Sequence, residues 1–165
     1  MAQTPTIDPC LWFDGRALEA AEFYISLFPD SHIDQVLRSP VDTPGAKKGD
    51  PLLIYFTLAG KQHQALNGGS HVSFNDAISL SVCCRDQAEV DRLWDALTAD
   101  GGKPVQCGWL KDKFGVAWQI VPMALHRMIN DKDPEKAEKV MQAMMQMVKI
   151  DVAGLQAAYD GTVAT

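Results

Sequence analysis

Residues 107–122 read CGWLKDKFGVAWQIVP, and this stretch predicts a β-hairpin that closes a domain. Residues 112–115 supply the turn, in which Gly115 is free to adopt a positive φ. Residues 116–121 are rich in β-branched and aromatic side chains and predict the second strand, which Pro122 ends because proline cannot donate to a β-ladder. Gln119 is the one polar residue in that apolar run, so its orientation and role form the central question about function.

The size and charge of the chain restrict the classes of partner. The chain has 165 residues, of which 47% are hydrophobic and 22% are charged, so it can bury a core without disulfides. The formal net charge of −6 argues against nucleic acid and against an anionic membrane, because no basic field is present to neutralise phosphates. No apolar run is long enough to span a bilayer, and residues 1–10 show no signal-peptide pattern, so we expect a cytoplasmic protein.

The cysteines carry no disulfide or metal pattern. The four cysteines are Cys10, Cys83, Cys84 and Cys107, and none of them shows C-x-x-C spacing. The adjacent pair would point to opposite faces of a strand. In a reducing compartment we expect four free thiols that are mostly buried.

The apolar periodicity predicts the element order βαβββ twice, which is an α+β fold of paired modules. The first module, about residues 5–68, has strands at 7–13, 31–38, 51–58 and 62–66, with a helix at 17–28 that Asp14 caps. The second module, about residues 76–122, has a strand at 77–84, a helix at 86–99 and short strands within 103–121. Asp86, with Glu89 three residues later, predicts a capping box for the second helix.

A helical segment, residues 123–165, is expected to follow the two modules. Helices are predicted at 134–147, which begins with a proline in a preferred position, and at 151–159. The first of them carries an apolar stripe formed by Val140, Met141, Met144, Met145 and Val148. Methionines at this spacing favour core packing or a subunit contact, so we expect a homodimer.

Three motifs resemble one protein family. LWFDG at 11–15, EFYISLFPDS at 22–31 and the stretch at 107–122 resemble the PhnB-like subgroup of the vicinal oxygen chelate superfamily, the superfamily of glyoxalases, bleomycin-resistance proteins and dioxygenases. The segment KIDVAGLQAAYDG at 149–161 resembles the tail of that subgroup. The resemblance implies a single glyoxalase-like domain over residues 1–165, in which each module curls its sheet into a cup.

Members of this subgroup are often labelled 3-demethylubiquinone-9 3-methyltransferase domains. A methyltransferase of the common fold needs a glycine-rich turn after its first strand, to approach S-adenosylmethionine closely. Here that turn is Asp14-Gly15, followed by Arg16, and no GxGxxG motif occurs anywhere in the chain. The sequence therefore argues against methyl transfer.

The resemblance also implies where a divalent metal would bind. Catalytic members of the superfamily hold a metal with His, Gln and Glu side chains, which lets the metal chelate two neighbouring substrate oxygens. The glutamate of the last strand usually lies four residues after the turn glycine, and that position is Gln119 here. A histidine position of the second module falls at Ser79, and serine is a poor ligand for first-row metals.

The first module leaves its ligand positions open. The first strand would supply Asp8 or Cys10, and the last strand would supply His63 or Gln64, because a slip of one residue exchanges the two faces. These residues do not form a two-histidine, one-carboxylate set, so we expect no resident cofactor and no tightly bound metal. If a metal does bind, the expected ligands are Asp8, His63 and Gln119.

The side chains expected to line the cup, and so to contact a small-molecule ligand, are Asp8, Cys10, Trp12, His63, Gln64, Ser79, Ser81, Trp109 and Gln119. Two roles remain open for Gln119: a buried amide bonded to Ser79 or to the backbone, or a ligand contact. For His63 we favour an ordinary half-buried strand residue. Trp118 should point to the opposite face, which the helix covers.

Three functions are compatible with these residues. The first, which we favour, is a protein that binds a small molecule without the usual metal site. The second is a metal-dependent lyase, isomerase or dioxygenase with atypical ligands, which rests on analogy of fold. The third is a dimeric structural or regulatory protein. Whether the protein is an enzyme is left open by the sequence.

Overall fold

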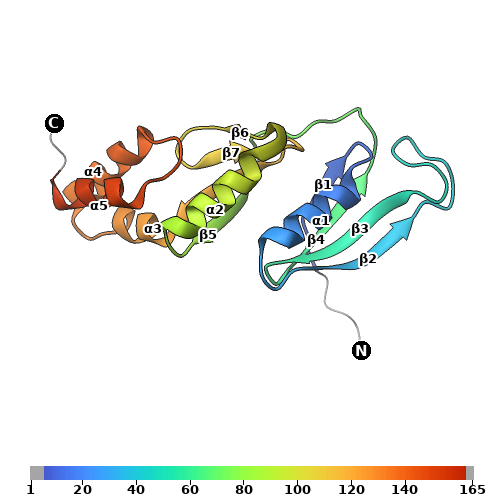
Figure 1. Ribbon diagram of the computed structural model, residues 1–165, viewed down its shortest axis with the longest axis horizontal. Coiled ribbons are helices and arrows are strands. Elements are labelled where there is room, and N and C mark those ends of the chain that lie inside the picture. The colour runs from blue at the N-terminus through green and yellow to red at the C-terminus, as the bar shows by residue number, and fades with distance from the viewer. Residues whose placement is uncertain (1–5, 163–165) are drawn as a thin grey trace. The chain divides into compact units, whose positions relative to one another are not determined.

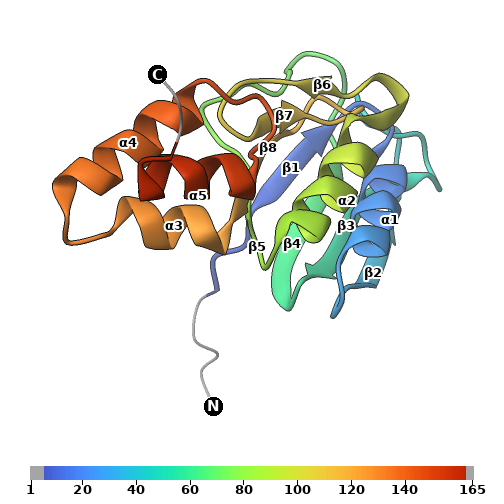
Figure 2. The same cartoon turned by 60° about the vertical axis from the view of Figure 1, so that its left-hand side comes forward.

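The computed structural model describes residues 6–162. The chain divides into two compact units between residues 74 and 75, and each unit contains a four-stranded sheet (Figures 1 and 2). The order βαβββ occurs in both units, so the predicted α+β class with paired modules is confirmed. Among the helices of residues 6–162, none combines the length and the apolar character that crossing a membrane requires.

The first unit is a mixed sheet with the strand order β1-β4-β3-β2. β1 and β4 are parallel, and the other neighbouring strands are antiparallel. The elements are β1 (Cys10–Phe13), α1 (Ala17–Leu27), β2 (His32–Arg38), β3 (Pro51–Leu58) and β4 (Lys61–Asn67). The proline- and glycine-rich residues 39–50 form a loop, as their composition predicts.

Helix α1 packs on one face of this sheet through small side chains. Its buried residues are Ala17, Ala20, Ala21 and Tyr24, and its main neighbour in the sheet is β3, with β2 and β4 on either side. Within residues 6–74, α1 is the only helix, so no helix of this unit covers the opposite face of the sheet. We call the sheet face opposite the βαβββ helix the open face of a unit.

The start of α1 differs from the prediction. Asp14 is not its cap, because the helix begins at Ala17 and a cap acts from the residue immediately before the first turn. That residue is Arg16, which makes no side-chain capping bond. Instead, the amide of Ala17 donates to Oδ1 of Asn67 at 2.9 Å, and Nδ2 of Asn67 donates to the Pro51 carbonyl at 2.9 Å. The end of β4 thus holds the start of the helix.

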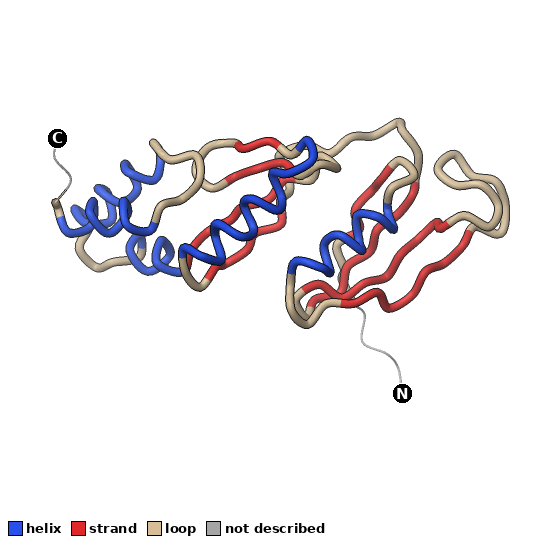
Figure 3. The backbone as a smooth tube through the Cα atoms, viewed as in Figure 1, coloured by secondary structure: helices blue, strands red, loops and turns tan. Residues whose placement is uncertain are grey.

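The second unit repeats this plan with the strand order β5-β8-β7-β6. Figure 3 shows the helices and strands of both units by colour. β5 and β8 are parallel, and the other pairs are antiparallel. The elements of its sheet and covering helix are β5 (Leu80–Cys84), α2 (Gln87–Thr98), a short 3-10 turn (Ala99–Gly101), β6 (Lys103–Pro104), β7 (Trp109–Lys111) and β8 (Ala117–Pro122).

The hairpin between β7 and β8 has the predicted turn. Gly115 adopts φ 88°, and its amide donates to the carbonyl of Asp112 at 2.9 Å. The Asp112 carboxylate is buried, and it accepts bonds from the amides of Phe114 and Val116 at 2.9 and 3.0 Å. It also accepts from Nε1 of Trp118 at 2.9 Å, which fixes the indole on the side of α2, as predicted.

Helix α2 confirms its predicted cap. The side chain of Asp86 accepts from the amide of Glu89 at 2.9 Å. The reciprocal bond of the capping box is shifted by one residue, because Glu89 accepts from the amide of Arg85 at 2.8 Å rather than from that of Asp86. The apolar face of α2 buries Val90, Leu93, Trp94 and Leu97.

Three helices follow β8, of which two were predicted. They are α3 (Met123–Ile129), α4 (Pro134–Met145) and α5 (Val152–Asp160). The sequence did not predict α3. This helix begins at Met123, directly after the last residue of β8, and no side chain caps it. The three helices share one hydrophobic cluster with the end of β8, formed by Val121, Leu125, Met128, Val140, Ile150 and Leu155.

The methionine stripe of α4 is only partly used in this cluster. Val140 is fully buried and Met144 packs against the cluster, so core packing explains these two residues of the stripe. Met141, Met145 and Val148 are exposed. The predicted subunit contact would have to use these three side chains, and it stays a prediction.

Candidate functional site

Gln119 lies on the open face of the second unit. Along β8 it alternates with Trp118 and Ile120, whose side chains are fully buried on the side of α2. In the register of the sheet, Gln119 stands between Ser81 on β5 and Trp109 on β7. The Gln119 side chain is half-buried, so its amide lies on the open face beside a hydroxyl and an indole.

A hydrogen bond orients this amide. Nε2 of Gln119 donates to Oγ of Ser79 at 2.8 Å, and Ser79 lies just before the start of β5. The bond was one of the two roles that the sequence left open for Gln119. Within residues 6–162, the amide oxygen Oε1 accepts no hydrogen bond. The Oε1 atom of Gln119 is therefore an oriented hydrogen-bond acceptor on the open face, beside Trp109.

The first unit places the same residue type at the same position. Gln64 on β4 pairs with Cys10 on the parallel strand β1 and with Tyr55 on the antiparallel strand β3. The order of thiol or hydroxyl, glutamine and aromatic residue across the sheet is therefore repeated in the two units. Another predicted site residue lies two positions before Cys10 in the first unit and two positions before Ser81 in the second. These residues are Asp8 and Ser79.

The register of β4 places His63 on the other face. His63, Ala65 and Asn67 are buried beneath α1, whereas Gln64 is half-buried on the open face. The imidazole of His63 lies against Phe56, with ring centroids 5.4 Å apart, and its Nδ1 bonds to the Lys61 carbonyl at 2.9 Å. His63 therefore packs as a strand residue of the core, and it does not lie on the same face as Gln64.

Trp12 closes the end of the first open face. It follows Cys10 by two residues on β1, so both side chains lie on the open face. Nε1 of Trp12 donates to the Gly69 carbonyl at 2.8 Å, and the ring meets His71 edge-on with centroids 5.0 Å apart. A Cβ atom at Gly68 would lie 2.2 Å from the indole, so only glycine allows this contact.

The residues on the open faces do not fit a catalytic divalent metal. Within residues 6–162, no three His, Cys, Asp or Glu side chains gather closely enough to hold a metal ion. In the second unit the donors beside one another are the neutral side chains of Gln119 and Ser79, and Nε2 of the amide is already committed to the hydroxyl. Neutral amide and hydroxyl groups bind first-row metals weakly. The histidine of the expected set, His63, is bonded within its own strand.

A polar network on the first sheet escaped the sequence analysis. Asp34 accepts from Nε2 of His32 at 3.1 Å and from Oγ1 of Thr57 at 3.0 Å. Thr57 in turn accepts from Nε2 of Gln62 at 2.6 Å. No partner was predicted for His32, although Asp34 lies two residues further along the same strand; only Thr57 and Gln62 join the network through the pairing of neighbouring strands. Alternation along residues 31–38 was the available signal, and a bulge between residues 33 and 35 obscures it.

The cysteines are free, as predicted, but two of them are exposed rather than buried. Cys10 and Cys83 are exposed, Cys107 is half-buried and Cys84 is buried. Cys83 and Cys84 do point to opposite faces of β5. Burial beneath α2 raises the pKa of the Cys84 thiol to about 12. The exposed pair arises because the open faces carry no helix over Cys10 or Cys83.

Comparison with known proteins assigns the family. A model of the 3-demethylubiquinone-9 3-methyltransferase family matches residues 5–121. The PhnB protein from Bacillus cereus is 33% identical, and the match covers 72% of this chain and 99% of that one with a TM-score of 0.65. The chain belongs to this family. It is a PhnB-like member of the vicinal oxygen chelate superfamily, as its motifs predicted.

Another structure agrees on the fold of this PhnB-like chain. Protein PA1353 from Pseudomonas aeruginosa is 22% identical, covers 72% of this chain and 98% of its own length, and has a TM-score of 0.60. A search of curated proteins finds no match. The family match ends at residue 121, before α3, so the resemblance of residues 149–161 to the subgroup tail stays a prediction.

Proposed function

We propose that this PhnB-like protein binds a small neutral molecule on the open face of its second unit, without a resident divalent metal. The observation that carries the proposal is the Gln119 amide, which Ser79 orients and Trp109 flanks. An oriented amide beside an aromatic surface is typical of small-molecule sites, where a few polar groups fix the orientation of an apolar ligand.

The amide chemistry indicates the class of ligand. Oε1 of Gln119 can accept one hydrogen bond, and the N–H that is not given to Ser79 can donate another. A ligand with a neighbouring donor and acceptor, such as a carboxamide or a lactam, complements both groups. Its apolar part would lie against Trp109, because burial of apolar area supplies most of the affinity for such molecules.

The start of helix α1 does not support methyl transfer, despite the family label. In the common methyltransferase fold the first helix offers its amino-terminal amides to the cofactor. Here the Ala17 amide at the start of α1 is already bonded to Asn67. The turn before it, Asp14-Gly15-Arg16, carries a side chain on two of its three residues. We therefore assign the family without assigning the reaction in its name.

Thermal-shift titration with n-alkanamides, from butanamide to decanamide, tests the proposal. We expect the wild type to be stabilised, Gln119→Ala to lose the shift, and Gln64→Ala to retain it as the matched control from the first unit. Metal content is measured on the same preparations. Stoichiometric metal that is lost in both Gln119→Ala and Asp8→Ala would support the alternative of a metal-dependent enzyme with atypical ligands, and would overturn the proposal.

We further propose a cytoplasmic homodimer. Four cysteines without a disulfide are compatible with a reducing compartment, and the exposed apolar side chains of α4 are compatible with a subunit contact. Light scattering measures the mass directly. A monomer at micromolar concentration would exclude the dimer and would leave the ligand proposal unaffected.

A further inference from the structure

The open face of the second unit ends against the helices that follow it. Val121 lies two residues beyond Gln119 on β8, so its side chain points to the same side of the sheet. That side chain is only 8% exposed, because it is part of the cluster that α3, α4 and α5 form. Residues 123–160 therefore cover the strand at this point, one side-chain position away from Gln119.

Backbone bonds hold this segment against the hairpin. The amides of Cys107 and Gly108 donate to the carbonyls of Met147 and Val148 at 2.8 and 2.9 Å. Gly108 has φ 81°, and a Cβ atom there would lie 2.9 Å from the Ile120 carbonyl and 3.0 Å from Cγ1 of Ile150. The residues between α4 and α5 therefore lie directly against the chain just before β7, and the absence of a side chain at Gly108 allows Ile150 to approach closely.

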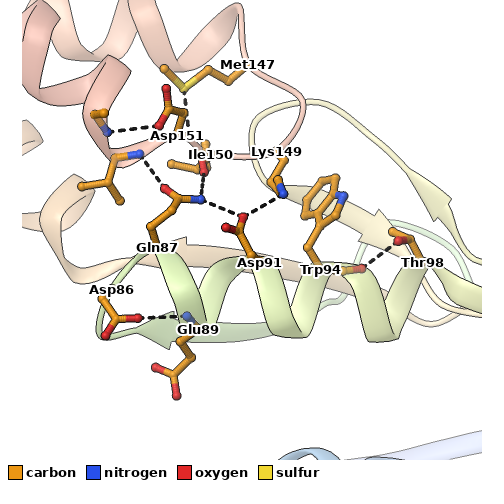
Figure 4. Close-up of polar contacts among 12 residues, drawn as sticks. Asp86, Gln87, Glu89, Asp91, Trp94, Thr98, Met147, Lys149, Ile150 and Asp151 are labelled. Atoms are coloured by element: carbon orange, nitrogen blue, oxygen red, sulfur yellow. Dashed lines mark hydrogen bonds and ion pairs between the residues drawn. The ribbon is translucent and has the colours of Figure 1, made fainter.

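Side-chain bonds tie the same segment to the start of α2 (Figure 4). Nε2 of Gln87 donates to the Ile150 carbonyl at 3.1 Å, and Oε1 of Gln87 accepts from the amide of Val152 at 2.8 Å. Nζ of Lys149 lies 2.7 Å from Oδ1 of Asp91. The segment is therefore fixed on two sides, by the hairpin and by the helix, and it forms a firm boundary rather than a loose tail.

The first unit has no such boundary of helices. Leu66 occupies the position of Val121, two residues beyond Gln64, and it is only half-buried. Within residues 6–74 no helix follows β4. In the second unit the neighbour of Val121 on β5, Cys83, remains exposed, so the boundary covers the β8 side and leaves the β5 side accessible.

We propose that residues 123–160 form the end wall of the ligand site on the second open face, and that Val121 sets the maximum length of the ligand's apolar tail. This inference rests on the proposed function, since it assigns a selectivity to that same site. An apolar tail that runs from the Gln119 amide along β8 meets Val121 and then the packed cluster. Longer tails would have to displace buried side chains, which costs free energy.

Protection of Cys83 from iodoacetamide tests the wall. The background is Cys10→Ser with Cys107→Ser, so that Cys83 is the remaining exposed thiol and Cys84 stays buried. The probes are n-alkanamides from butanamide to decanamide. We expect protection to rise with chain length and then to fall sharply at a limiting length. Val121→Ala removes two methyl groups and should move this limit up by about one methylene, whereas Val121→Ile should move it down.

The first unit supplies the control, with Cys10 as the reporter in a Cys83→Ser background. Leu66→Ala should neither create nor move a sharp limit in the protection of Cys10, because no helix follows β4 within residues 6–74. If short alkanamides protect Cys83 but neither Val121 variant moves the limit, the wall is disproved and the ligand site stands. If no alkanamide protects Cys83, the proposed function fails, and the inference about the wall fails with it.

Discussion

The two units carry the same arrangement of residues across their open faces but end those faces differently. In the first unit Cys10, Gln64 and Tyr55 stand side by side, and in the second Ser81, Gln119 and Trp109 do so. The repeated part is the part that faces outward from the sheet. Because the βαβββ helix of each unit packs on the other face of its sheet, this repetition is compatible with the ligand site proposed above.

The ends of the two fourth strands show the difference. Asn67 and Pro122 occupy the same register position, each paired with the last residue of the parallel first strand. Asn67 reaches back to start helix α1, whereas Pro122 leads directly into α3. At this position, an asparagine bonds to the helix of its own unit, whereas a proline leads into a further set of helices. The ends are therefore where the units have diverged.

The largest expected contrast concerns thiol reactivity on the two faces of the sheets. Iodoacetamide at about pH 8 should modify Cys83 readily and Cys84 very slowly, because Cys83 is exposed, whereas burial beneath α2 hides the Cys84 thiol and raises its pKa to about 12. Cys10 is exposed at the surface, but desolvation by its surroundings raises the pKa of its thiol, so Cys10 should react slowly for an exposed cysteine. Peptide mass spectrometry gives each rate, and equal rates for Cys83 and Cys84 would show that α2 does not seal its face.

The hairpins provide the next contrast, in the free energy of unfolding. Asp112→Ala should cost about 3–5 kcal/mol, since it strips three donors of a buried acceptor. In the first unit the equivalent turn has one exposed side-chain bond, from the Ala59 amide to Oγ of Ser31 at 2.8 Å, and Ser31→Ala should cost less than about 1 kcal/mol. Urea unfolding measures both changes.

Asp112→Asn is the control for shape, since it keeps the oxygen that accepts from Phe114 and Val116 but loses the charge and the acceptor of Trp118. It should cost about half as much as Asp112→Ala if the hydrogen bonds carry the effect. An equal cost for Asp112→Ala and Ser31→Ala would mean that the buried carboxylate does not hold the hairpin.

The sequence predicted the repeated parts of the fold well, because they depend on local chemistry. The turn at 112–115, the cap at Asp86 and the side of Trp118 each follow from residues that lie close together in the chain. The family itself followed from three short motifs. These features required no knowledge of which strands pair with which.

The features that the sequence missed depend on residues far apart in the chain. Asp14 was expected to cap α1, but Asn67, fifty residues beyond Ala17, takes that place. The choice between His63 and Gln64 needed the register of β4, and the bond from Thr57 to Asp34 needed the pairing of β2 with β3. Helix α3 was missed for a local reason, since it lacks both a capping side chain and a preceding loop.

The two helix starts give a smaller contrast. Asn67→Ala should cost about 2–4 kcal/mol, because the Ala17 amide and the Pro51 carbonyl would both lose a buried partner. Asp86→Ala should cost about 1 kcal/mol, as is usual for an exposed N-cap. Asn67→Asp keeps the acceptor for Ala17 and separates the two bonds. Similar costs for Asn67→Ala and Asp86→Ala would refute the idea that β4 and α1 are coupled through this side chain.

The smallest contrast lies within the attachment of the carboxy-terminal helices, which only the second unit has. Gln87→Ala should cost about 1–3 kcal/mol, since it removes the partners of the Ile150 carbonyl and the Val152 amide together. Lys149→Ala should cost less than about 1 kcal/mol, because its ion pair with Asp91 is largely exposed and is screened by salt. Gln142→Ala, which removes an exposed glutamine of α4, is the matched control and should change stability by no more than about 0.5 kcal/mol. If Lys149→Ala proved the more costly variant and its cost vanished at high salt, the segment would be held by charge, and its attachment would be adjustable by ionic strength rather than fixed by the fold.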